Sequence, residues 1–444
     1  MIPLRQKIAK LFYWATKPDT LRYLEEINQL QWLSRDELTY RQHQQLLDLL
    51  KYANTYIPYY QKLFKEIGFH PADFAADPAN FTRLPLLTKQ IVRQNHKDFI
   101  TTEQNKQNKL VKVKTGGTTG EPMWLMYDSS YRAYNTAHVY QEMTWSGWQV
   151  GQSQAWLWGH PVVGGRSQVT NVKDWIANRY ESNAFHITEE TLEKLALHLE
   201  KHPDSVLWSY VSTMCQFAKF LEQRGQHQKL RAAYTAAEPL YDNQRELINK
   251  VLQCPVFNSY SCVEIGSIAC ECEQHNGLHL RTRNCYVEIL QDNQVVPDGV
   301  EGEIVLTNLT NYSFPLIRYQ IEDWGRKSPL ACSCGRGLPM LKVVEGRIID
   351  HFKSNDGQLV WGAFVIPMVP MLGSIKQYQI VQKSVDQLVF RVIADGPIDE
   401  TKFLEIQQAV RKVLGHNVEA KLEFVDSLPA TPTGKHRYTS SEVT

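Results

Sequence analysis

The sequence has almost no net charge, because 48 Lys and Arg residues face 47 Asp and Glu residues, which leaves +1. Proteins that hold nucleic acid by its phosphates carry an excess of basic residues, so the bulk charge gives no indication of such a partner. Internal repeats and low-complexity tracts are absent as well. The remaining composition, 43% hydrophobic and 21% charged, is that of an ordinary globular protein. At 444 residues, two or more domains are expected.

The N-terminus lacks the features of a signal peptide, because Arg5, Lys7 and Lys10 interrupt any apolar core and no small-residue cleavage site follows. Its larger apolar residues recur at helical spacing: Leu4, Ile8, Leu11 and Phe12. Such a helix could lie on a membrane surface or pack against its own domain, and packing is the favoured expectation. Cytoplasmic localisation is expected from the missing export signal.

The chain also lacks a hydrophobic run suited to a membrane span. The longest uncharged stretch covers residues 357–375, but Pro367, Pro370 and three glycines interrupt it, which predicts strand and turn. No transmembrane segment is therefore expected. Eight cysteines in a reducing compartment indicate free thiols or a metal site rather than disulfides.

Hydrophobic periodicity predicts an α/β fold. Residues up to about 110 look helical, with a helix beginning near Ser34. Short apolar segments then alternate with amphipathic ones, which is typical of a mostly parallel sheet flanked by helices. The expected strands are 155–158, 206–210, 232–235 and 256–257, and the expected helices are 189–201, 214–224 and 243–252.

The pattern changes in the last third of the chain. Strands are expected at 286–290 and 303–306, joined through a turn at 297–299. A small α+β unit follows, with strands at 377–382, 388–393 and 420–424 and a helix at 400–414. The predicted organisation is a large domain, 1–347, which includes an insertion around 270–334, and a small C-terminal domain, 348–444.

A loop rich in glycine and threonine joins two predicted strands, 110–113 and 123–127. Glycine lets backbone N–H groups converge on an anion, and threonine hydroxyls add donors. The loop lacks the Gly-Lys-Ser/Thr ending of a P-loop. It could be a phosphate loop or an ordinary hairpin loop, and its residues are Thr115, Gly116, Gly117, Thr118, Thr119 and Gly120.

Four further motifs follow in a fixed order. They are Ser-Tyr-Ser-Cys-Val-Glu-Ile-Gly at 259–266, Arg-Tyr-Gln-Ile-Glu-Asp at 318–323, Gly-Arg-Ile-Ile-Asp at 346–350 and Pro-Thr-Gly-Lys-His-Arg at 432–437. With the Thr/Gly loop and the segments 52–60 and 84–89, they resemble the adenylate-forming enzyme superfamily. The resemblance is to its phenylacetate–CoA ligase-like branch and to the branch associated with capsular polysaccharide biosynthesis. It covers nearly the whole chain, and it implies a large domain followed by a small mobile one.

The resemblance also implies a nucleotide site. The Thr/Gly loop would hold the β- and γ-phosphates of ATP, and Glu264 would hold Mg2+, which prefers oxygen ligands. Asp323 would accept the ribose hydroxyls. Adenine would lie between two short segments, Ala237, Glu238 and Pro239 on one side and Ser259, Tyr260 and Ser261 on the other.

The catalytic residues implied by the resemblance are Lys435 and Glu264. Lys435 would neutralise charge on the α-phosphate as an acid attacks it, and the hinge at Arg347 would then rotate Lys435 away. Three departures from the family pattern concern phosphate binding and loop geometry: Glu121 for lysine, and Ser261 and Glu322 for glycine.

The implied activity is ATP-dependent activation of an aryl or other small apolar acid, followed by transfer to CoA. Transfer to an amine, for example on a sugar, is an alternative, and an inactive binding module is another. The expected partners are the acid and CoA or the amine, with no nucleic acid, and a homodimer is compatible with the chain. Trp145, Trp148, Trp156 and Trp158 could line the acid pocket or form core, and His160 could bind the carboxylate or cap a strand.

Cysteine and histidine residues form a second candidate site. Two clusters separated by a folded segment suit tetrahedral Zn2+, and the resemblance adds a structural zinc in this region. The alternative is a set of reduced core cysteines. Cys270 and His275 are kept in reserve, Cys254, Cys262 and Cys285 are expected in the core, and the expected ligands are Cys272, His279, Cys332 and Cys334.

Overall fold

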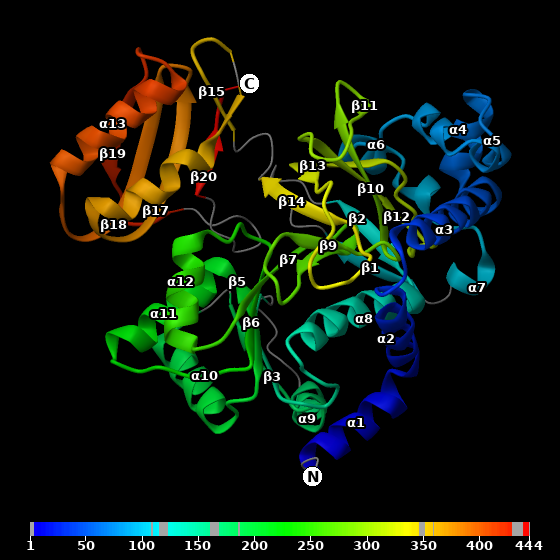
Figure 1. Cartoon of the computed structure of the whole chain (residues 1–444), viewed down its shortest axis with the longest axis horizontal. Helices are drawn as coiled ribbons and strands as arrows, with labels where there is room; N and C mark the ends of the chain where they lie inside the picture. The colour runs from blue at the N-terminus through cyan, green and yellow to red at the C-terminus, as the bar shows by residue number, and fades with distance from the viewer. Residues whose placement is uncertain are drawn as a thin grey trace. The chain divides into compact units, whose positions relative to one another are not determined.

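The structure, a computed structural model, describes residues 4–107, 110–114, 123–159, 168–184, 187–345, 351–357, 359–428 and 438–443 (Figure 1). The chain folds into two compact units. The first consists of residues 1–321 and 325–344, and the second of residues 322–324 and 345–444. The domain boundary expected at residue 347 lies outside the described residues.

Helices make up the first hundred residues of the first unit, as expected. The longest, α3, begins after Ser34, whose side chain accepts from the Glu37 N–H while Glu37 accepts from the Ser34 N–H. This reciprocal capping box is the local reason for the helix start. The helical elements are α1 (Leu4–Thr16), α2 (Pro18–Leu30), α3 (Arg35–Tyr56), α4 (Pro58–Glu66), α5 (Pro71–Ala76), η1 (Pro78–Arg83), α6 (Lys89–Gln94), η2 (His96–Phe99) and α7 (Gln104–Gln107).

A 12-stranded mixed sheet forms the centre of the first unit, in the order β11-β10-β12-β13-β14-β9-β8-β7-β6-β5-β3-β4. The pairs joining β4, β3, β5, β6 and β7 are parallel. The pairs of β7 with β8, β8 with β9 and β10 with β12 are antiparallel. The parallel strands are β3 (Gln154–Trp158), β4 (Arg179–Asn183), β5 (Val206–Tyr210), β6 (Ala232–Ala236) and β7 (Val256–Cys262). The others are β8 (Gly266–Glu271), β9 (Leu278–Leu280), β10 (Cys285–Gln291), β11 (Gln294–Val295), β12 (Gly302–Asn308), β13 (Tyr319–Lys327) and β14 (Met340–Glu345).

Helices cover both faces of the parallel strands, because alternate side chains point to opposite faces. Leu207 and Ala233 pack in a core with α10, α11 and α12. Trp208 and Tyr234 pack in another core with α8, and Figure 1 shows these helices on the two sides of the sheet. The helices are α8 (Ser129–Trp145), α9 (Gln168–Ile176), α10 (Glu189–Lys201), α11 (Val211–Gln223) and α12 (Asp242–Leu252). The expected alternation is confirmed, but α8, α9 and β4 were not predicted.

The second unit contains a four-stranded sheet in the order β19-β18-β17-β20. The stretch 357–375, expected as strand and turn, contains strand β16 and the start of β17, with an 11-residue 3-10 helix, η4, between them. The prediction of turn was wrong because η4 continues through both prolines. The elements are β15 (His351–Lys353), β16 (Leu359–Trp361), η4 (Gly362–Leu372), β17 (Gly373–Ser384), β18 (Gln387–Ile398), α13 (Glu400–Leu414), β19 (Glu419–Phe424) and β20 (Thr439–Ser441).

Helix α1 packs against its own unit, as expected, but Leu4 and Leu11 of its predicted apolar face do not take part. Gln6, Ala9 and Tyr13 form its buried face, and Leu4 and Leu11 are exposed. Tyr13 occupies the interior with its hydroxyl donating to the Ala177 carbonyl. The apolar spacing correctly predicts a helix, but the aromatic residue decides which face packs.

Candidate functional site

The two segments predicted to enclose adenine lie beside each other. Strands β6 and β7 are parallel, and Ala236 is paired with Ser259, so the turn after β6 meets the end of β7. Ala237 adopts φ +67°, which reverses the chain at the strand end. The buried Glu238 carboxylate accepts from the Ser212 N–H at 2.6 Å and from its hydroxyl at 2.9 Å. The turn is thereby fixed to the start of α11.

Strands β7 and β8 form a tight hairpin that carries Glu264 at its turn. Gly266 follows at φ +82°, and a Cβ there would lie 1.9 Å from Asn135 Oδ1. This position therefore requires glycine both for its backbone angle and for space. The hydroxyl of Tyr127 donates to the Val263 carbonyl, which fastens another part of the chain to the Glu264 turn.

That other part is the hairpin of β1 (Val111–Lys114) and β2 (Trp124–Tyr127), the two strands flanking the Thr/Gly loop. Lys114 is paired with Trp124 in antiparallel register. Because Tyr127 belongs to β2, the strand that leaves the loop meets the Glu264 turn. The loop itself, 115–120, and Glu121 lie outside the described residues.

A buried ion pair beneath the β7–β8 hairpin supports its position. Glu142 on α8 accepts from the Ser259 hydroxyl at 2.9 Å and from the Ser267 hydroxyl at 2.6 Å. Its carboxylate lies 3.1 Å from an Arg281 nitrogen, and neither side chain is exposed. Arg281 also donates to Gln141 at 2.8 Å. One carboxylate thus connects both strands of the hairpin to a buried cation.

Sequence patterns did not indicate this pair. Glu142 and Arg281 lie far apart in the chain, and neither belongs to a recognisable motif. Glutamate on a helix and arginine beyond a strand are both common on protein surfaces. Only the packing of α8 beneath β8 removes them from water, so the local sequence contained no signal for the pairing.

The 318–323 motif begins in the core of the first unit. Arg318 lies 3.0 Å from Glu288 in a buried ion pair, and burial raises the pKa of Glu288 while Arg318 opposes that shift. The N–H of Leu87 donates to the Arg318 carbonyl at 2.8 Å, so the 84–89 segment is paired with the start of β13.

The last two residues of this motif, Glu322 and Asp323, belong to the second unit. Glu322 adopts φ +65°, the left-handed conformation that glycine tolerates best. The departure from glycine in the family pattern therefore leaves a glycine-like backbone in place. Asp323 is half-buried. Arg347 and Lys435, by contrast, lie outside the described residues.

The four expected zinc ligands come together. Their ligand atoms, from Cys272, His279, Cys332 and Cys334, all lie within 4.8 Å of one another. The Cys272 and Cys332 sulfurs are 3.7 Å apart, and the Cys334 sulfur is 3.3 Å from His279 Nε2. Tetrahedral Zn2+ with Zn–S bonds of about 2.3 Å would place two sulfurs about 3.8 Å apart. The donor set and its spacing therefore fit this ion.

The surroundings of this cluster orient its histidine. His279 Nδ1 lies 3.2 Å from the Leu338 carbonyl, and an N–H there would leave Nε2 free for a metal. Burial lowers the pKa of His279 to about 4, so the ring is neutral near pH 7. Arg336 lies beside Cys334 and forms two 2.9 Å contacts with Glu273.

Neither reserve residue joins the cluster. Cys270 is fully buried with its sulfur directed at the Glu271 carbonyl. His275 Nδ1 lies 3.2 Å from the Glu271 carboxylate, which is also paired with Arg245. Cys254 and Cys285 are buried, whereas Cys262 is half-buried.

The four tryptophans all contribute to one hydrophobic core, Trp145 and Trp148 as buried members and Trp156 and Trp158 as half-buried side chains packed against it. Trp145 and Trp148 are buried, and their indole N–H groups donate to Gln31 and to the Gln152 carbonyl, so the core alternative holds for both. Trp156 begins a row of stacked rings that crosses neighbouring strands: Trp156, Trp208, Tyr234 and Phe257. His160 and the following glycine pair, 164–165, lie outside the described residues.

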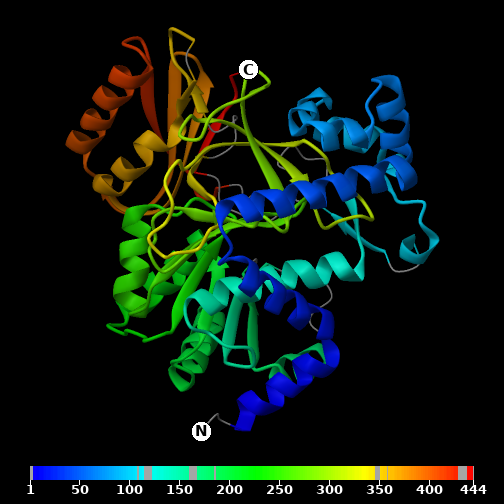
Figure 2. The same ribbon diagram turned by 45° about the vertical axis from the view of Figure 1, so that its right-hand side comes forward.

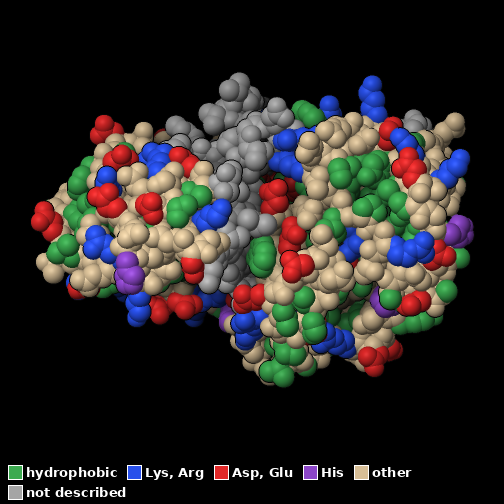
Figure 3. Space-filling view, turned by 90° about the horizontal axis from the view of Figure 1, so that it is seen from above, with side chains coloured by type: hydrophobic (Ala, Val, Ile, Leu, Met, Phe, Trp, Pro, Cys, Tyr) green, Lys and Arg blue, Asp and Glu red, His purple; other side chains and the backbone are tan. Residues whose placement is uncertain are grey.

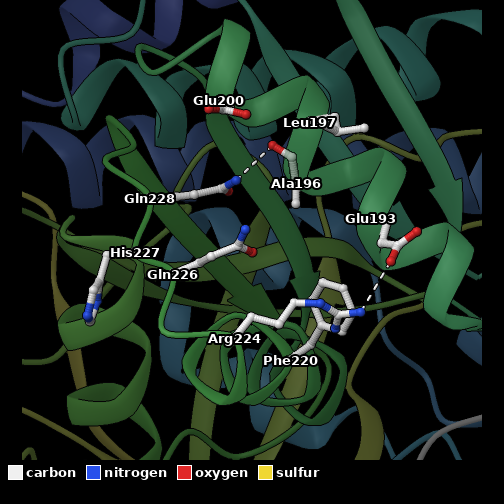
Figure 4. Close-up of a pocket in the computed structure, with 9 residues that line it drawn as sticks. All are labelled: Glu193, Ala196, Leu197, Glu200, Phe220, Arg224, Gln226, His227 and Gln228. Atoms are coloured by element: carbon white, nitrogen blue, oxygen red, sulfur yellow. Dashed lines mark hydrogen bonds and ion pairs between the residues drawn. The ribbon is translucent and has the colours of Figure 1, made fainter.

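A hollow of about 330 Å3 lies between α10 and α11 (Figure 4). Arg224 pairs there with Glu193 at 3.2 Å, and none of the predicted site residues lines it. On the face shown in Figure 3, acidic and basic side chains are interspersed, so that face carries no large patch of one charge sign. Among the described residues, no helix has the length and hydropathy needed to cross a bilayer.

Comparisons with known proteins agree with this arrangement. The CapK C-terminal domain family matches residues 352–442. Protein CapK of Staphylococcus aureus is 23% identical over 96% of this chain and 93% of its own length. A phenylacetate-coenzyme A ligase of Pseudomonas putida is 26% identical, covering 75% of this chain and 74% of the relative.

Solved structures share the fold. A 2-hydroxyisobutyryl-CoA ligase in the postadenylation state superposes with a TM-score of 0.76 at 18% identity, covering 94% of this chain and 92% of that one. An O-succinylbenzoate coenzyme A synthetase from Bacillus subtilis, in complex with ATP and magnesium ion, has a TM-score of 0.52 at 15% identity, covering 74% and 68%. These matches confirm the family resemblance and the fold class.

Proposed function

We propose that this chain, a relative of CapK and of the phenylacetate-coenzyme A ligases with the fold of adenylate-forming ligases, activates a carboxylic acid with ATP. The acid carboxylate would attack the α-phosphorus, forming an acyl-adenylate as pyrophosphate leaves. Such a step needs mostly positioning and charge neutralisation. The eight free cysteines are consistent with a reducing cytoplasm as its location.

One observation carries the proposal. Three separate segments assigned to the nucleotide meet at one edge of the sheet: the turn at Ala237, the Ser259–Glu264 region and the strand that follows the Thr/Gly loop. In parallel sheets, ligands bind beyond the carboxyl ends of the strands, and β6 and β7 end there. Tyr260, half-buried beside this turn, would stack on adenine.

The remaining roles complete the reaction. Glu264 would supply an oxygen ligand to Mg2+, whose charge would offset that of the departing pyrophosphate. The loop at 115–120 would bind the β- and γ-phosphates, and Asp323 the ribose hydroxyls. Lys435 would approach the α-phosphate, and rotation about Arg347 would withdraw it before the second step.

In that second step, the thiol of CoA would attack the acyl carbonyl, giving a thioester and releasing AMP. An aryl or other small apolar acid is the proposed substrate class. An amine, for example on a sugar, is the second candidate acceptor. The nucleophile would then form an amide, with the same release of AMP.

Pyrophosphate exchange tests the first step. The protein, ATP, Mg2+ and a panel of aryl, fatty and amino acids should exchange labelled pyrophosphate into ATP with at least one acid. AMP release on adding CoA, compared with an amino sugar, would then identify the acceptor. A folded protein that binds ATP without exchange on any acid would favour the binding-module alternative.

Lys435→Ala is expected to lower the exchange rate by about a hundredfold to a thousandfold, because removing one preorganised charge-stabilising group from an active site typically has an effect of this size. Binding of ATP, measured by calorimetry, should change little. Unfolding of the variant would instead identify Lys435 as a structural residue. Lys412→Ala, on the same unit in the last turn of α13, is the matched control and should exchange normally.

We also propose that Cys272, His279, Cys332 and Cys334 bind one structural Zn2+. The ion would connect the end of β8, strand β9 and the loop between β13 and β14. Four protein ligands would fill its coordination sphere and leave no open position for a substrate. Its role would therefore be stability rather than chemistry.

A further inference from the structure

Helix α1 presents Leu4, Ile8 and Leu11 to solvent. Its buried side consists of Gln6, Ala9 and Tyr13. On the opposite side, Leu4 is 74% exposed and Leu11 is 71% exposed. At 100° per residue, these leucines share one face with Ile8, which is also exposed. An apolar face turned outward is unusual for a helix at the edge of a unit, and it indicates a surface that contacts something else.

The exposed apolar surface continues beyond this face. Trp14 at the end of α1 is 65% exposed, and Trp175 on α9 is 66% exposed. The Arg5 guanidinium lies 5.7 Å from the centre of the Trp175 ring, which links the two helices side by side. Val172, one turn from Trp175, is exposed as well. Figures 1 and 2 both show α1 and α9 together at the margin of the first unit, next to the N-terminus.

The charges around this surface have mostly one sign. Helix α1 contains Arg5, Lys7 and Lys10 and no acidic residue, and α9 adds Lys173. The one acidic residue of these two helices, Asp174, interacts with Lys17. This local excess contrasts with the whole chain, whose net charge is only +1, and with the interspersed charges visible in Figure 3.

We propose that α1 and α9 form a docking surface for an anionic lipid bilayer. The α1 axis would lie parallel to the membrane, with Leu4, Ile8 and Leu11 at the boundary between headgroups and acyl chains. The two exposed indole rings suit the same interfacial depth, where tryptophan is enriched. Lys7 and Lys10 would extend their amines towards lipid phosphates while their stems cover apolar surface.

The basic residues of α1 favour a membrane, rather than a second copy of the chain, as the partner of this surface. Pairing α1 with its own copy would bring two sets of Arg5, Lys7 and Lys10 together with no acidic residue on either helix. An anionic bilayer supplies the opposite charge over its whole plane. This association would be peripheral and reversible, and it does not depend on the proposed enzymatic activity.

Vesicle co-sedimentation of the full-length protein tests this proposal, using phosphatidylcholine vesicles with and without about one-third phosphatidylglycerol. The wild type should bind the anionic vesicles and lose binding as salt is raised. The triple variant Leu4→Gln, Leu11→Gln, Trp14→Gln should bind at least tenfold less. The pair Lys7→Gln, Lys10→Gln should bind about 25-fold less, since each lysine near an anionic surface contributes about fivefold.

Matched controls come from exposed residues elsewhere. Leu197→Gln with Leu330→Gln removes exposed leucines, and Lys62→Gln with Lys65→Gln removes helical lysines on α4. Both control variants should bind like the wild type. Equal wild-type binding to neutral and anionic vesicles, or undiminished binding by the triple variant, would overturn the proposal. A wild-type dimer in light scattering that the triple variant converts to monomers, without vesicle binding, would assign the surface to a second copy.

Discussion

Among single residues, the buried charges are held in place by specific partners. Glu142 and Arg281 have no exposed side-chain surface, and removing a charge from water is costly unless its partners replace the lost hydration. Glu142 has three such partners in Ser259, Ser267 and Arg281. The pair therefore holds the β7–β8 hairpin at one position relative to α8.

Glu142→Ala should lower the free energy of unfolding by about 3–5 kcal/mol, because it leaves Arg281 in the core without a counter-ion. Denaturant titration followed by circular dichroism measures this change. Replacing both members, Glu142→Leu with Arg281→Met, should cost less than the single change. A larger loss in the double variant would show that shape rather than charge governs this site.

A second residue-scale prediction concerns pH. Burial, with smaller contributions from His202 and Arg5, lowers the pKa of His198 to about 4, against about 6.5 in an unfolded chain. Between these values the unfolded chain binds a proton that the folded chain does not, so acidification favours unfolding. Stability should therefore fall as the pH decreases from about 6.5 towards 4.

His198→Phe, which can retain the ring stacking against Tyr180, should flatten that decline. The midpoint of thermal unfolding at neutral and at mildly acidic pH gives the comparison. His227→Phe is a suitable control, because His227 is exposed and lies on a loop. An unchanged pH dependence in His198→Phe would mean that other groups control acid stability.

At the scale of elements, a loop without regular structure joins β13 to β14 and carries two of the four proposed zinc ligands. Gly337 within it approaches the α2–α3 connection so closely that a Cβ would lie 1.9 Å from the Leu33 carbonyl oxygen. Its neighbour Arg336 donates to Gln31 at 2.9 Å. The position of this loop therefore depends both on its tight packing against the α2–α3 connection and on the Cys/His cluster.

Purified protein should contain about one zinc per chain. Cys332→Ser with Cys334→Ser should abolish zinc content and lower the unfolding midpoint, because half of the ligand set is lost. Cys215→Ser changes a half-buried cysteine on α11 and should retain zinc. Elemental analysis with a thermal melt measures both effects, and a zinc-free wild type of normal stability would refute the site.

At the scale of the whole molecule, the proposed zinc ligands and the proposed catalytic lysine belong to different units. The four proposed zinc ligands and the 12-stranded sheet lie within residues 1–345, whereas Lys435 lies in the sequence of the second unit. A chain ending at Glu345 should therefore bind zinc and unfold cooperatively, yet fail to exchange pyrophosphate. Loss of zinc or of cooperative unfolding would show that the first unit needs the second in order to fold.

The sequence by itself determined the helices and strands and the types of side chain in the candidate metal site. Alternating apolar patterns predicted α10, β5 and α13 with their observed bounds, because such periodicity reflects which side chains a helix or strand can bury on one face. Motif order predicted the family resemblance, and the Cys/His clusters together with that resemblance predicted which four side chains come together.

Only the tertiary structure decided which surfaces meet. The Glu142–Arg281 pair, the core positions of Trp145 and Trp148 and the outward face of α1 all depend on packing between distant segments. Local periodicity specifies that a helix has an apolar side, but the partner that covers that side is fixed by contacts far along the chain. For α1, Tyr13 fills the interior and leaves the leucines outside.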